Sequence, residues 1–113
     1  MGADEIRPVY LKNQNSDEIN ANSNQGTWLW TGDLRLITIQ VYAGFDGAPG
    51  TQAEIIGDMQ PSNTIPAYSH GQRLGDAVTG VGIFQFSGPI NWIRIRRSAG
   101  SGALSVRIGG IYN

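Results

Sequence analysis

The sequence predicts an all-β protein: a single antiparallel β-sandwich of jelly-roll-like type with an extended N-terminal arm. Its 113 residues include 16 glycines but only 15% charged side chains, below the roughly 25% typical of soluble domains. Short segments of alternating apolar and polar residues are separated by Gly, Pro, Asn and Ser, as in half-buried strands joined by turns. No segment long enough to form a helix shows helical periodicity. Hydrophobic residues make up 40% of the chain, which suffices for one core.

The first 26 residues differ from the rest of the chain. Residues 6–11 predict a short strand, and Pro8, which lacks an N–H, favours a sheet edge or a strand added to another protein. Residues 13–26 are polar and Asn-rich, with Ile19 as the only large apolar side chain, so they cannot fold alone. We therefore divide the chain into an arm, 1–26, and a sandwich domain, 27–113, and expect the arm to bury little against its own domain and to order on a partner.

The central part of the chain predicts two or three strands and a long irregular segment. After residues 27–30 comes a strand over 34–43, where apolar and polar residues alternate from Ile37 onward. Leu34 and Leu36 have the opposite parity to Ile37, which predicts a bulge near residue 36. A short strand follows over 52–56. Residues 58–76 form a long loop, and loops of this length are usually functional or contact surfaces.

The C-terminal third predicts three consecutive strands, over 77–86, 91–98 and 103–112, joined by tight turns as a meander. In the second strand, Ile93 and Ile95 face one way, and Arg94 and Arg96 the other. A four-residue loop between the last two strands would place Arg94 opposite Arg107, so we expect Arg94, Arg96 and Arg107 on one outward face. The predicted core comprises Ile37, Ile39, Val41, Phe84, Phe86, Ile93, Ile95, Leu104, Val106 and Ile108.

Charge predicts protein partners. The net charge is −1, so the chain has no overall positive field that would attract nucleic acid. Residues 1–33 contain five acidic against two basic side chains, and residues 34–113 contain six arginines against four acids. The arginine face therefore predicts carboxylates from a neighbouring copy or another protein, and homo-oligomerisation. A solvated face and a nucleic-acid patch remain alternatives.

The sequence predicts a protein that is made in a cytoplasm and does not associate with membranes. No apolar stretch approaches the roughly 20 residues of a membrane span. The N-terminus has neither the positive region nor the apolar core of a signal peptide.

No motif predicts chemistry, so we expect neither an enzyme nor a bound metal or cofactor. The only histidine, His70, has no nucleophile in a recognisable context. Asp46, Asp58 and Asp76 each adjoin a glycine, which is typical of turns, although loop carboxylates can also hold Ca²⁺. There is no cysteine and no glycine-rich phosphate-binding motif.

Trp28 and Trp30 share a strand parity, so their rings should lie on the same face. Three interpretations stay open: the rings close the sandwich core, anchor a protein interface, or stack on sugar rings. The last would make the chain a carbohydrate-binding module, recognisable by exposed coplanar rings.

The stretch 84–94, FQFSGPINWIR, followed by AGSG at 99–102 and a final VRIGG strand, resembles small β-sandwich proteins of tailed-bacteriophage virions. The resemblance implies a non-enzymatic structural protein located in the virion, most of all a capsid decoration (cement) protein on the major capsid protein. A neck, tail or baseplate component is the alternative. The residues assigned to the protein interface are Arg94, Arg96, Arg107, Trp28, Trp30, Pro8 and Tyr10.

Overall fold

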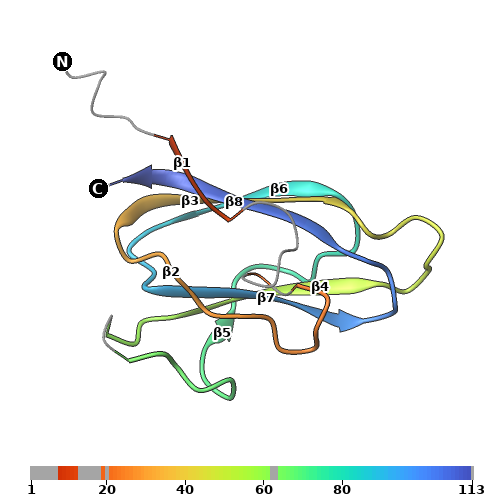
Figure 1. The fold of residues 1–113 in the computed structure, drawn as a ribbon, viewed down its shortest axis with the longest axis horizontal. Helices are drawn as coiled ribbons and strands as arrows, with labels where there is room; N and C mark the ends of the chain where they lie inside the picture. Colours follow the sequence, from red (N-terminus) through yellow and green to blue (C-terminus); the bar gives the residue numbers. More distant parts are fainter. Residues whose placement is uncertain (1–7, 13–18, 20, 62–63, 113) are drawn as a thin grey trace.

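The computed structural model describes residues 8–12, 19, 21–61 and 64–112, and these contain eight strands and no helix. The strands form two four-stranded sheets packed face to face (Figure 1). All strand pairs are antiparallel. The predicted fold class, an antiparallel β-sandwich, is therefore confirmed.

The two sheets have the strand orders β1-β8-β3-β6 and β2-β7-β4-β5. We call them sheet A and sheet B. Sheet A consists of β1 (Pro8–Lys12), β8 (Ser105–Tyr112), β3 (Leu34–Ala43) and β6 (Gly82–Ser87), and sheet B of β2 (Leu29–Trp30), β7 (Trp92–Ala99), β4 (Gln52–Asp58) and β5 (Gln72–Arg73). This is the double-sheet arrangement of an eight-stranded jelly roll.

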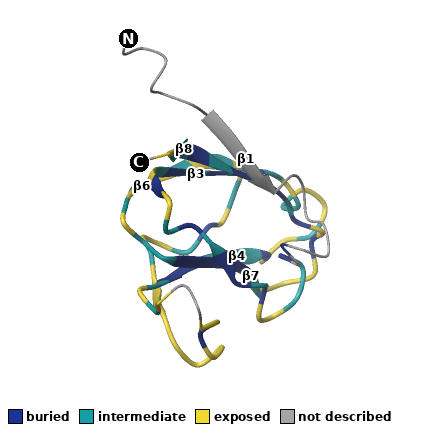
Figure 2. Cartoon of the chain, turned by 60° about the vertical axis from the view of Figure 1, so that its left-hand side comes forward, coloured by how far each residue is buried: buried dark blue, intermediate teal, exposed yellow. Residues whose placement is uncertain are grey.

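The main core lies between the sheets, where Figure 2 shows the buried residues. All ten predicted core residues belong to it, but Phe84 and Phe86 are only partly buried because β6 lies at the margin of sheet A. The predicted alternation in β7 is confirmed, since Ile93 and Ile95 are buried in this core. The predicted bulge is confirmed by a register shift between Leu34 and Leu36 in the pairing of β3 with β8.

The predicted C-terminal meander is wrong. β6 and β8 belong to sheet A, whereas β7 belongs to sheet B, so the chain changes sheet at each connection. Thr31 binds the first of these connections, between β6 and β7. Its backbone N–H donates to Asn91 O at 2.8 Å and its hydroxyl donates to Ile90 O at 2.6 Å. Turn residues predict where a chain reverses, but not whether the next strand pairs with the last one or crosses the core.

Part of the N-terminal segment packs into the domain. β1 pairs with β8 at the margin of sheet A, the edge position that Pro8 predicts. Ile19 and Ala21 are fully buried in the main core, and Asn22 Oδ1 accepts a hydrogen bond from Leu104 N at 2.6 Å. These residues therefore contradict the expectation that the segment buries little against its own domain. The rest of the predicted connector, 13–18 and 20, lies outside the described residues.

Candidate protein-binding surface

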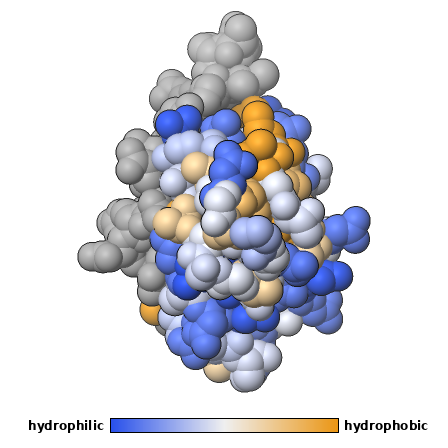
Figure 3. Space-filling model, turned by 90° about the vertical axis from the view of Figure 1, so that its right-hand side faces the viewer, coloured by the Kyte–Doolittle hydropathy of each residue, from blue (hydrophilic) through white to orange (hydrophobic). Residues whose placement is uncertain are grey.

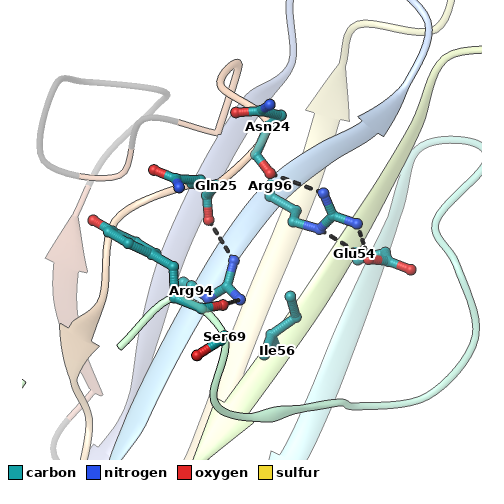
Figure 4. A pocket seen from close by; sticks show the side chains of 8 residues that line it. Asn24, Gln25, Glu54, Ile56, Ser69, Arg94 and Arg96 are labelled. Atoms are coloured by element: carbon teal, nitrogen blue, oxygen red, sulfur yellow. Dashed lines mark hydrogen bonds and ion pairs between the residues drawn. The ribbon is translucent and has the colours of Figure 1, made fainter. Parts of the chain in front are cut away.

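The outer face of sheet B carries a group of charged and aromatic side chains. Because residues alternate along β7 and β4, Ile95 and Ile55 enter the main core, while Arg94, Arg96 and Ile56 point outward. Two segments cover part of this face: Asn24 and Gln25, and the connection between β4 and β5, which includes Tyr68 and Ser69 (Figure 4). The long segment that the sequence predicts as a contact surface thus contacts its own sheet.

Arg94 is the centre of this group and is only 5% exposed. Its Nη1 donates to the backbone oxygen of Gln25 at 2.6 Å, and its Nη2 donates to that of Tyr68 at 2.7 Å (Figure 4). The guanidinium carbon lies 4.9 Å from the ring centroid of Trp28 and 5.5 Å from that of Tyr68. Arg94 therefore fixes both covering segments to sheet B.

Burial lowers the pKa of Arg94 below its ordinary value, and the positive charge of Arg96 acts in the same direction. The guanidinium still carries its charge near neutral pH, because arginine is effectively always protonated in proteins. The oxygens that accept its hydrogen bonds, Gln25 O and Tyr68 O, belong to neutral carbonyl groups, so they do not cancel that charge.

Arg96 and Arg73 share one carboxylate beside this buried arginine. Arg96 Nη2 lies 2.8 Å from Glu54 Oε1, to which its Nε also donates at 3.0 Å, and Nη1 donates to Asn24 O at 2.8 Å. Arg73 Nη1 lies 3.5 Å from Glu54 Oε2. Arg96 and Arg73 thus share one carboxylate, while Arg94 donates to carbonyl groups, so arginines outnumber carboxylates in this group. We call Arg73, Arg94, Arg96 and Glu54 the arginine cluster.

A shallow pocket of about 400 Å³ opens over the cluster. Its lining is mostly polar and includes Asn24, Gln25, Glu54, Ser69, Arg94 and Arg96 (Figure 4). Arginine pairs well with carboxylates, often through two hydrogen bonds at once. The chemistry of this surface therefore suits an acidic side chain of a protein partner.

The expectation that Arg94, Arg96 and Arg107 share one face is wrong, because β7 and β8 belong to different sheets. Arg94 pairs in register with Ile56, whereas Arg107 pairs with Gln40 on sheet A. Arg107 lies 4.2 Å from the ring centroid of Tyr42. Sequence reasoning missed Arg73, since it belongs to a two-residue strand in the long irregular segment and has no periodic signal.

The tryptophans form a second hydrophobic cluster on the outer face of sheet B. Trp28, Trp92 and Ile56 are buried there, and Trp30 packs against them. Trp28 and Trp30 thus belong to one cluster, as their parity predicts, but this cluster is separate from the main core. Trp30 and Trp92 meet edge to face at 71°, and the Trp30 indole donates to Asp33 Oδ2 at 3.0 Å. The exposed coplanar rings expected of a sugar platform do not form.

The remaining predicted interface residues, Pro8 and Tyr10, belong to β1, where Tyr10 pairs with Gly109. Their side chains lie outside the described residues.

A second pocket, of about 490 Å³, contains His70 together with Asp58, Met59 and Leu74. Its described lining contains no serine, threonine or cysteine that could serve as a nucleophile beside the histidine. The described ranges contain no group of three or more His, Cys, Asp or Glu residues that could hold a metal ion. Asp46, Asp58 and Asp76 therefore do not converge.

The described part of the chain has no helix with the length and hydrophobicity needed to cross a membrane.

The strand order defines the chain as an eight-stranded jelly-roll sandwich. The crystal structure of the SPBc2 prophage-derived protein YomS has a similar fold, with a TM-score of 0.59 over 94% of this chain and 92% of that chain. The two sequences are 8% identical, so the likeness concerns the fold. No protein-family model and no curated protein matches the chain.

Proposed function

We propose that this chain is a non-enzymatic structural protein of a bacteriophage virion that acts through protein–protein contacts. The observation that supports this most is the fold it shares, over nearly the whole of both chains, with a prophage-derived protein. The resemblance of residues 84–94 to virion β-sandwich proteins supports it independently. The proposal gives the chain protein partners, and neither nucleic acid nor a membrane.

Within the virion, we assign the chain to the capsid as a decoration protein that binds the major capsid protein. A preformed sandwich with a charged face suits attachment to a finished shell, because the described side chains of that face are already held in place before binding. The arginine cluster supplies that face, since three arginines against Glu54 complement an acidic surface. A neck, tail or baseplate position would use the same contact, so the test below includes both structures.

The double variant Arg73→Gln/Arg96→Gln is expected to bind shells at least about tenfold more weakly than wild type, because interfacial charge pairs steer and orient association. Co-sedimentation with empty shells of the major capsid protein from the same genome, and separately with purified tails, measures the dissociation constant. Binding of the wild-type protein should weaken as salt rises. Arg107→Gln removes one positive charge from the opposite sheet and should bind as wild type does.

The decoration role is supported if the wild-type protein binds shells saturably and the double variant binds them more weakly. If the protein binds tails alone, it is assigned to the tail instead. Binding to neither structure overturns the proposed function. Equal effects of the double variant and Arg107→Gln would remove the arginine cluster from the contact.

A further inference from the structure

Strand β6 forms one margin of sheet A and pairs only with β3 among the described strands. The strand order places β6 and β1 at opposite margins of this sheet. The pairing with β3 is regular from Ser87 to Gly82 and contains no bulge. The side of β6 away from β3 therefore presents backbone N–H and C=O groups over a regular six-residue strand, which is a template for another strand.

The other sheet margins carry features that discourage such pairing. β1 begins at Pro8, ends at Lys12 and contains a bulge between Tyr10 and Lys12. β2 and β5, at the margins of sheet B, have only two residues each. Short strands, prolines, lysines and bulges are the usual protection of an edge. The β6 sequence, Gly-Ile-Phe-Gln-Phe-Ser, has no proline and no charge.

The margin formed by β6 is also hydrophobic. Val81 and Ile83 are 67% and 64% exposed, and Phe84 and Phe86 are only partly buried. No charged residue occurs anywhere in residues 77–93. In Figure 3 a hydrophobic region lies at the height of sheet A, with polar atoms around it. A second copy of this strand would therefore meet no like charge and would cover apolar surface.

We propose that β6 pairs antiparallel with β6 of a second copy around a twofold axis, so that two A sheets join into one. In such pairing the core-facing side of one β6 continues the core-facing side of the other. Each residue must therefore lie opposite a residue that faces the same side of the sheet. The registers that overlap best are centred on Phe84 or on Gln85. The first places Phe84 opposite Phe84, and the second places Phe84 opposite Phe86, so phenylalanines meet in both. This proposal concerns the chain alone and does not depend on the virion role.

The variants Ile83→Lys and Gln85→Lys test the pairing, because each adds a positive charge to the β6 margin of both copies. Sedimentation equilibrium between about 1 µM and about 1 mM should show a wild-type dimer whose dissociation constant rises at least about tenfold in either variant. Ile65→Lys makes the same exchange at an isoleucine that is 69% exposed and outside sheet A. Its dissociation constant should equal that of wild type.

A further control separates pairing at the margin from packing of the sheet face. Thr38 accepts a hydrogen bond from Gln85 at 3.2 Å and lies on β3, an inner strand of sheet A. Thr38→Lys therefore charges the same face without charging the margin, and it should leave the dimer intact. A monomer at all concentrations, a dimer insensitive to both β6 variants, or an equal effect of Thr38→Lys would each overturn the proposal. Thermal unfolding confirms that every variant is folded.

Discussion

Replacing Arg94 with alanine is expected to lower the free energy of unfolding by about 3–5 kcal/mol. Each hydrogen bond from a charged group contributes roughly 1.5–3 kcal/mol, and Arg94 donates two, to Gln25 O and Tyr68 O. The variant also removes the contacts with the Trp28 and Tyr68 rings. Arg94→Lys should restore only part of the loss, because one ammonium group cannot reproduce the two-pronged geometry of a guanidinium. Urea unfolding measures both values.

Arg107→Ala is the matched control for Arg94→Ala, since it removes the same side chain from the opposite sheet. Arg107 lies over the Tyr42 ring, and an exposed contact of this kind contributes about 0.5–1 kcal/mol. The loss should therefore stay within about 1 kcal/mol. Similar losses in the two variants would contradict the role given to Arg94 as the residue that fixes both covering segments.

Truncating Ile19 to alanine is expected to cost about 2–5 kcal/mol, as other large-to-small core substitutions do. Ile19 is fully buried in the main core although it lies in an Asn-rich segment. Ile65→Ala removes the same atoms from an exposed position and should change stability by no more than about 0.5 kcal/mol. An Ile19→Ala protein as stable as wild type would show that the segment contributes nothing to the core. Removal of residues 1–26 should destabilise the sandwich for the same reason.

The strands that alternate regularly could be predicted from the sequence with good accuracy. β3 spans the predicted residues 34–43, because a run such as Ile37 to Val41 is diagnostic of a half-buried strand. Pro8 predicted an edge strand and the parity change at Leu36 predicted a bulge, since both depend on local backbone chemistry. The inward and outward sides of β7 followed from the same period of two.

What the sequence could not predict depends on contacts between distant segments. Parity placed Arg94 away from the main core, but it could not show that Gln25 and Tyr68 cover that side of sheet B. Ile19 is a single apolar residue without periodicity, so nothing in its neighbourhood predicted burial. A hairpin turn between β7 and β8 would place Arg107 opposite Arg94, but the connection crosses from one sheet to the other.

The proposed location of the chain in a virion can be measured directly by mass spectrometry of density-purified phage particles, with heads and tails analysed separately. We expect the chain to be present in intact particles, to be enriched in the head fraction and to occur in many copies per head. Enrichment in the tail fraction would move it to the tail position. If infected cells express the chain but the particles purified from them lack it, the proposal that it is a structural protein of the virion is contradicted.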